Sequence, residues 1–427
     1  MKKVIFDKLD LELYSETLEN GLDIYIVPRT IGKNIYATFT TKYGSIHNEF
    51  IPHGESDYVK VPNGIAHFLE HKMFEQENGE DPFSLYSKNG SNCNAFTTFY
   101  NTTYLFSGTK FFEENINLLL NFVQDPYFTE ENVEKEKGII VEEIKMYKDE
   151  PYVCGEEILL ENAFFNHSVN VSIAGSEDSV VSITKEDLYT CYKTFYHPSN
   201  MFLVITGNVE PEEVIKIIKE NQDKKEFEKS NKIEIREVNE PNEVKVKEAT
   251  ICMNVVIPKA FIGYKFNIEN LNLTVEEITV YLNILADLKF SNVATFTEQL
   301  LNNEKISSDI EYVVTRAGKH LFMMILADTK KPTEFISSIK EEITKWDIKE
   351  EDFNRKKKAA ISSFLYMSDN VYNVNRKVMN DVIFKGGADS KLYDKYQRLN
   401  FNDLKNIFDN LSFDNNTTLT INPNKTK

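Results

Sequence analysis

Cysteine is scarce in this chain of 427 residues, and its four copies are scattered along the sequence. No two of them form a C-x-x-C pair; they are Cys93, Cys154, Cys191 and Cys252. The spacing indicates neither a disulfide framework nor a zinc site built from thiolates, so we expect reduced thiols.

Long apolar runs are lacking too. The apolar stretch after Met1, Lys2 and Lys3 is too short for a signal peptide, and no stretch reaches the length of a transmembrane helix. We therefore expect a cytoplasmic protein without a membrane span.

Positive charge is in deficit: 49 Lys and Arg residues face 67 Asp and Glu residues, and the formal net charge is −18. This argues against nucleic acid and anionic lipid as partners, because both repel an acidic surface. The surplus of negative charge fits basic peptides that enter an acidic cavity. Acidic residues on solvated helix faces, which only confer solubility, would give the same net charge. Hydrophobic residues at 41% and charged residues at 27% are typical of a folded globule.

One motif stands out, His67-Phe68-Leu69-Glu70-His71. Residues at i and i+4 of a helix share a face, so His67 and His71 can offer two imidazoles to one metal ion. Glu70 reaches the same side and can accept a proton from a water molecule at that ion.

The motif needs a helix. Pro62-Asn63-Gly64 is a breaker cluster that predicts a helix over about residues 65–74, with Asn63 as its N-cap. Two histidines at this spacing also occur as surface or core residues without a metal. The glutamate between them favours the metal interpretation.

A zinc site needs a third protein ligand, and a catalytic site leaves the fourth position to water. Residues 129–147 predict a strong helix, with Thr129 as N-cap and Pro151 beyond its end. In a helical projection, Glu136 and Glu143 lie on the apolar stripe, whereas Glu142 points about 100° away. We expect that stripe to contain Ile139, Ile140, Met146 and Tyr147.

A buried carboxylate costs several kcal/mol unless it is paired or bound to a metal, so two acids on a core face indicate a cation. We predict zinc, held by His67, His71 and Glu143. Glu70 and Glu136 are the predicted catalytic carboxylates: Glu70 as the base, and Glu136 as the group that orients an imidazole or Glu143. The alternative for Glu136 is a surface acid paired with a lysine.

With these residues the chain resembles the pitrilysin family of zinc metallopeptidases, the inverzincins, in which H-x-x-E-H precedes a glutamate at this separation. The segment 90–106 looks like the family's edge strand, in which Asn94 and Ala95 would face the bound peptide. The segment 196–207 resembles a later strand, and Asn20-Gly21-Leu22 an opening hairpin. The resemblance covers at least residues 15–210 and is closest to the short bacterial branch.

The resemblance implies one Zn²⁺ per chain, hydrolysis of peptide bonds, and a peptide bound as an added strand. It also implies an arginine and a tyrosine from a second domain. In the corresponding stretch, Leu301 occupies the arginine position, and Tyr312 is the nearest tyrosine. We therefore predict a homologous partner that lacks the H-x-x-E-H motif and supplies both residues. A homodimer is the alternative assembly.

Length predicts two domains, residues 1–230 and residues 231–427. The resemblance implies that the first carries the zinc site and that the second is a related metal-free copy. The charged and polar segment 221–248 is interpreted as a linker with a short exposed strand. We predict an α+β fold in which each domain has a mainly antiparallel sheet with helices on one face. The predicted helices are 65–75, 111–124, 130–148, 155–166, 275–288, 333–346 and 351–367.

Two other functions remain compatible with this sequence. The chain would be a structural subunit that binds metal without catalysis, or a subunit that binds and presents peptides without cutting them. The intact Glu70 favours a peptidase over both. The natural substrate does not follow from the sequence.

Overall fold

The computed structural model describes residues 1–6, 8–30, 32–229 and 232–424. It divides into two compact units. Unit 1 comprises Met1–Ile144, Ser172–Glu237 and Ser363–Tyr393, and unit 2 comprises Lys145–Val171, Val238–Ser362 and Asp394–Lys427. The predicted boundary falls between residues 230 and 231, which lie outside the described residues. In the structure the chain passes from unit 1 to unit 2 nearby, between Glu237 and Val238. The prediction did not foresee that residues 145–171 and 363–393 each join the other unit.

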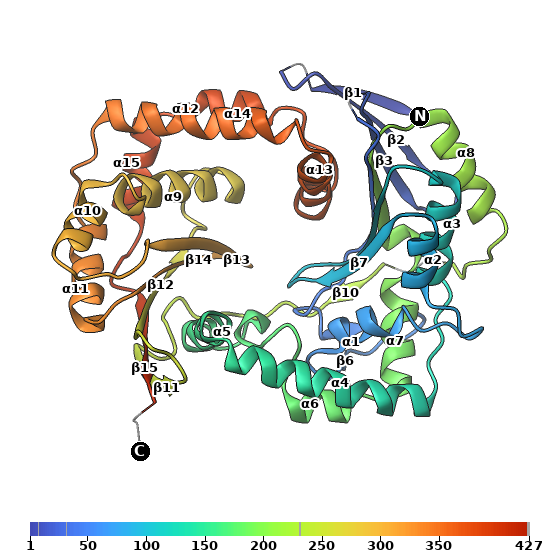
Figure 1. The fold of residues 1–427 in the computed structure, drawn as a ribbon, viewed down its shortest axis with the longest axis horizontal. Helices are drawn as coiled ribbons and strands as arrows, with labels where there is room; N and C mark the ends of the chain where they lie inside the picture. The colour runs from blue at the N-terminus through green and yellow to red at the C-terminus, as the bar shows by residue number, and fades with distance from the viewer. Residues whose placement is uncertain (7, 31, 230–231, 425–427) are drawn as a thin grey trace. The chain divides into compact units, whose positions relative to one another are not determined.

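Unit 1 is built on a seven-stranded sheet in the order β1-β2-β3-β9-β4-β8-β7 (Figure 1). All neighbours run antiparallel except β3 and β9, which are parallel. A small sheet, β10-β5-β6, accompanies it. The strands are β1 (Lys2–Phe6), β2 (Leu11–Thr17), β3 (Asp23–Pro28), β4 (Ile35–Thr41), β5 (Glu49–Ile51), β6 (Val59–Lys60), β7 (Asn92–Thr97), β8 (Thr102–Gly108), β9 (Met201–Gly207) and β10 (Glu234–Ile235).

Helices cover both faces of this sheet. Strands β4 and β9 are buried along their whole length, as expected for central strands. One face receives α3 and α8, and Figure 1 shows α13 on the opposite side. The helices that lie wholly or mainly in unit 1 are α1 (Ile65–Lys72), α2 (Pro82–Lys88), α3 (Phe112–Val123), α4 (Glu130–Asp149), α6 (Glu177–Ser182), α7 (Lys185–Phe195), α8 (Pro211–Gln222) and α13 (Val371–Lys385).

Helix α13 comes from the second half of the sequence and is anchored by polar bonds to the sheet. The amide of Asn375 donates to the Val204 carbonyl at 2.8 Å, and the Thr38 hydroxyl donates to Asn375 at 2.9 Å. These buried bonds satisfy polar groups on a face that the prediction left without helices. The α+β class is confirmed, with this second covered face as an addition.

Unit 2 has a five-stranded sheet in the order β11-β15-β12-β14-β13, with only β11 and β15 parallel. Helix α5, from the first half of the sequence, packs on β12 and β15. A Cβ on its Gly155 would lie 2.4 Å from the Phe261 ring, so glycine permits this close approach. The strands are β11 (Glu248–Met253), β12 (Lys259–Asn267), β13 (Glu311–Ala317), β14 (His320–Asp328) and β15 (Asn416–Pro423).

The other face of that sheet carries the main core of unit 2, in which Ile262 and Tyr264 pack with Leu282 and Leu285. The helices that lie wholly or mainly in unit 2 are α5 (Pro151–Ala163), α9 (Val275–Phe290), α10 (Thr295–Asn302), α11 (Pro332–Ile343), α12 (Glu350–Met367), α14 (Leu392–Arg398) and α15 (Phe401–Asn410). Among the described residues, no helix is long and apolar enough to cross a bilayer.

The linker prediction is wrong for its last part. Glu240 is only 4% exposed and accepts a hydrogen bond from the Lys265 ammonium at 2.6 Å. Its carboxylate also accepts the backbone amides of Phe165, Asn166 and His167. The charge is buried because it is fully paired, which composition alone does not reveal.

Candidate metal centre

Helix α1 begins at Ile65, as predicted, but its N-cap is not the predicted residue. Its N-cap is Gly64 with φ of 89°, and no side chain caps it. Asn63, the predicted cap, instead accepts a hydrogen bond from Asn48. A Cβ on Gly64 would lie 2.3 Å from the Ala174 carbonyl oxygen, so a contact distant in sequence fixes where the helix starts.

Helix α4 begins as predicted. The Thr129 hydroxyl accepts the Asn132 amide at 3.1 Å, and the Asn132 side chain accepts the Thr129 amide at 2.9 Å. This reciprocal pair confirms Thr129 as the N-cap.

The predicted apolar stripe of α4 is only partly correct. Ile140 and Ile144 are buried, but Ile139 is 49% exposed and Met146 is 60% exposed. The buried stripe is narrower than the projection assumed, because the packing of Val133, Ile140 and Ile144 selects one side of the helix.

The structure brings His67, His71 and Glu143 together. His67 Nε2 lies 3.8 Å from one Glu143 oxygen, and His71 Nε2 lies 3.4 Å from the other. One ligand atom from each of the three residues fits within 4.8 Å of the others. Among the described residues, no other group of three or more His, Cys, Asp or Glu meets this criterion.

Glu136 contacts this group of three residues through His71. Its carboxylate pairs with His71 Nδ1 at 2.9 Å, and its side chain is 13% exposed. The alternative of a surface acid paired with a lysine does not match this geometry. Because Nδ1 faces a carboxylate, the other ring nitrogen, Nε2, is left toward Glu143.

Glu70 approaches the group without joining it. Its carboxylate accepts a hydrogen bond from the Thr97 hydroxyl of β7 at 2.6 Å. Sequence reasoning missed Thr97, although it lies only three residues after Asn94 in the segment 90–106. The pairing of α1 with β7 was the missing information.

Burial and charge set the protonation of these groups. Burial and the neighbouring His71 together lower the pKa of His67 to about 4, against the opposing effect of Glu143 and Glu136. Burial also lowers the pKa of His71, but the hydrogen bonds that its ring donates to Glu136 and Glu143, with the charge of these carboxylates, outweigh burial and raise the pKa to about 10. Burial raises the pKa of Glu70, and the bond from Thr97 limits that rise.

The donor set fits zinc. Two imidazoles and one carboxylate are ligands that zinc accepts, and three protein ligands leave a fourth position open. Three partly buried carboxylates, Glu70, Glu136 and Glu143, lie around two histidines, and a dication would offset this excess of negative charge. These three residues could therefore hold a metal ion, with the Glu70 carboxylate beside it.

The predicted peptide-facing residues lie on an edge strand. Strand β7 is the last strand in the sheet order and pairs with β8. Asn94 is exposed, and its side-chain oxygen accepts the Ala95 amide at 2.9 Å. An edge strand with exposed positions is able to accept another strand.

The stretch predicted to lack the arginine lies in unit 2. Leu301, on α10, is 40% exposed. The Tyr312 hydroxyl on β13 donates to Asp287 at 2.5 Å, and Arg316 pairs with Glu276 at 3.7 Å. Both polar side chains thus have partners within unit 2.

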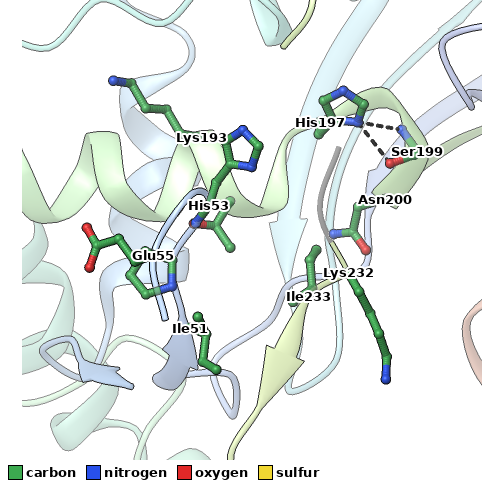
Figure 2. Close-up of a pocket in the computed structure, with 11 residues that line it drawn as sticks. Ile51, His53, Glu55, Lys193, His197, Ser199, Asn200, Lys232 and Ile233 are labelled. Atoms are coloured by element: carbon green, nitrogen blue, oxygen red, sulfur yellow. Dashed lines mark hydrogen bonds between the residues drawn. The ribbon is translucent and has the colours of Figure 1, made fainter. Parts of the chain in front are cut away.

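A separate cavity of about 50 Å³ in unit 1 contains none of the predicted site residues (Figure 2). His53 and His197 line it, but His53 pairs with the Glu228 carboxylate at 3.1 Å and His197 bonds to the Glu228 carbonyl at 2.8 Å. The Lys193 and Lys232 side chains extend away from each other in Figure 2. Among the described residues, the side chains that line this cavity form no group of three metal-ligating atoms, so nothing indicates a second metal centre here.

Comparison with known proteins identifies the family. A family model described as insulinase (peptidase family M16) matches residues 53–177, and one described as peptidase M16 inactive domain matches residues 182–360. The uncharacterized zinc protease YmfH of Bacillus subtilis is 43% identical over 340 residues, which is 79% of each chain. The chain belongs to peptidase family M16.

Two further similar proteins are a solved structure and a curated relative. The crystal structure of a putative M16-like peptidase from Alicyclobacillus acidocaldarius is 31% identical, with a TM-score of 0.92 over 98% of this chain and 100% of that one. A probable mitochondrial-processing peptidase subunit beta of Arabidopsis thaliana is 30% identical over 37% of this chain and 30% of its own length. The resemblance inferred from the motif is confirmed.

Proposed function

We propose that this M16 protein is a zinc-dependent endopeptidase that hydrolyses peptides or processes a peptide precursor. His67, His71 and Glu143 hold the zinc. The observation that carries the proposal is their convergence from two helices, with the carboxylate of Glu70 beside them and bonded only to Thr97 among the described hydrogen bonds. Relatives named as zinc proteases support it.

Each residue has a defined task. Zinc, when bound, supplies Lewis-acid chemistry that polarises a peptide carbonyl and makes water a stronger acid. Glu70 accepts a proton from the attacking water and passes it to the leaving amine. Its raised pKa suits that exchange, because a carboxylate with a higher pKa is a better base. Glu136 holds the His71 ring in one orientation.

Peptide binding falls to β7. Asn94 and Ala95 lie on this edge strand, and a substrate added as a further strand would gain main-chain hydrogen bonds. Such binding tolerates varied sequences, since backbone groups are common to all peptides.

The test is Glu70→Gln in the full chain. We expect peptide cleavage to fall by at least about 100-fold while one zinc per chain is retained. Glu142→Gln is the matched control, because Glu142 is an exposed glutamate on α4 beside the ligand Glu143. Unchanged cleavage in the Glu70 variant would remove this residue from the reaction.

We further propose that the active form is a heterodimer, with a homologous chain that lacks H-x-x-E-H and supplies an arginine and a tyrosine. Leu301 in the expected arginine position supports this division, and one relative is named as a subunit of a processing peptidase. The purified chain is assayed alone and with that partner. Full activity of the chain alone would contradict the heterodimer and leave a monomer or homodimer.

A non-catalytic structural or peptide-binding subunit is the second candidate, favoured by the match of residues 182–360 to the model described as an inactive domain. It predicts bound zinc but no turnover of a broad peptide library, with zinc and the partner present. We propose cytoplasmic location on the sequence evidence given above, and cell fractionation tests it.

A further inference from the structure

The hydroxyl of Thr97 is the only described hydrogen-bond donor to the Glu70 side chain. Thr97 is the last residue of β7, and its Oγ1 lies 2.6 Å from Glu70 Oε2. Across the hairpin, Thr97 is paired with Thr102 of β8, whose Oγ1 is 3.4 Å away.

The direction of these bonds is set by the neighbours. The Thr102 hydroxyl donates to the Tyr43 carbonyl at 2.9 Å, a shorter contact than the one to Thr97. A carboxylate only accepts, so the proton between Thr97 and Glu70 comes from Thr97. The distance of 2.6 Å between Thr97 Oγ1 and Glu70 Oε2 is typical of a charge-assisted hydrogen bond.

We propose that Thr97 is a positioning residue for Glu70 and that it ties the base to the strand on which the peptide binds. The inference rests on the proposed peptidase function. A glutamate side chain has a soft terminal torsion, and a bond to Oε2 restricts it. Oε1 is then left to exchange the proton with water and the leaving amine.

This arrangement connects two functions through one strand. Asn94 and Ala95, predicted to face the peptide, are on the same short strand as Thr97. A peptide that docks along β7 fixes the strand whose Thr97 hydroxyl is bonded to Glu70 of α1. The position of the base is thereby coupled to the position of the scissile bond, and small misplacements are costly to catalysis.

The experiment compares Thr97→Val, Thr97→Ser and Thr102→Val in the full chain with its partner. Valine keeps the shape of threonine without the hydroxyl, and serine keeps the hydroxyl. Thr102→Val removes a hydroxyl from the same hairpin without touching Glu70, so it reports purely structural damage.

We expect Thr97→Val to lower kcat by about 10- to 100-fold with little change in KM and with one zinc still bound. Thr97→Ser is expected to recover most of kcat, and Thr102→Val to lower thermal stability more than kcat. Wild-type kcat in Thr97→Val would overturn the inference, as would equal losses in the valine and serine variants.

Crystal structures of the Thr97 variants give a readout that does not depend on activity. The Glu70 carboxylate is expected in one position in the serine variant and in several positions in the valine variant. One unchanged position in both would also overturn the inference. Absence of turnover by wild-type protein with zinc and partner would instead contradict the proposed function, and the Glu70 positions would still test Thr97.

Discussion

Gly64 sets the position of α1, the helix that carries two of the proposed zinc ligands, and its replacement by alanine tests this directly. Its φ of 89° costs a residue with a side chain about 1–2 kcal/mol. The new Cβ would also lie 2.3 Å from the Ala174 carbonyl oxygen and 2.8 Å from its carbon. Both atoms are backbone, so α1 or the Ala174 loop must move by about 1 Å to restore an ordinary contact.

We expect Gly64→Ala to lose about 2–4 kcal/mol of unfolding free energy. His67 and His71 follow within two turns, so the shift moves them relative to Glu143 on α4. A misplacement of about 1 Å is expected to lower kcat/KM by about 100-fold and to weaken zinc binding.

Two other glycines separate the effect of backbone strain from the effect of the steric clash with Ala174. Gly54 has φ of 81° with nothing within 4 Å of an added Cβ, so Gly54→Ala measures the backbone strain alone. Gly138 lies inside α4 with the same open space, and Gly138→Ala should stabilise the protein by up to about 1 kcal/mol. Urea unfolding and zinc titration against a competing chelator provide the measurements. A Gly64 variant no less stable than the Gly54 variant, with unchanged zinc affinity, would refute the reasoning.

Three further predictions follow. Glu136→Gln is expected to weaken zinc binding by about 10- to 100-fold, because His71 loses its carboxylate partner; equal affinity in a chelator competition would contradict this role. Glu240→Gln leaves the buried Lys265 ammonium without its counter-charge and should cost about 3–5 kcal/mol in urea unfolding, whereas a loss under about 1 kcal/mol would mean that the pair matters little. Removal of zinc by a chelator should lower the midpoint temperature of thermal unfolding. Zinc at 100 times its Kd contributes about 2.7 kcal/mol to the free energy of unfolding, and this contribution is lost with the metal. An unchanged midpoint would argue against a bound metal.

The grouping of His67, His71 and Glu143 was predictable because it depends on local spacing within two helices. An i, i+4 pair of histidines and a capped helix with acids seven residues apart define faces that any α-helix must present. The predicted bounds of α1, α4 and α9 accordingly agree with the structure to within a few residues.

What failed depended on contacts between distant residues. Gly64 caps α1 because of Ala174, and Asn63 would have been the choice from propensity alone. Strands β12 and β15 and helix α13 were not predicted as elements. Strand β12 is buried throughout and shows no alternation of apolar and polar residues, so its sequence lacks the period of a half-exposed strand.

The exchange of segments between the two units was also invisible. Helix α5 packs on the sheet of unit 2 through Gly155, and α13 on the sheet of unit 1 through Asn375. Neither residue carries a sequence signal for its partner. Thr97 belongs to the same class, since only the pairing of β7 with α1 brings its hydroxyl to Glu70.

Zinc content is the most direct measure of the central claim. Metal analysis of wild-type protein, Glu143→Gln and Glu142→Gln, all prepared without chelator, compares two adjacent glutamates on α4. The account predicts one zinc per chain in the wild type and in the Glu142 variant, and a large loss in the Glu143 variant. Wild-type protein without zinc, or equal zinc in the two variants, would contradict it.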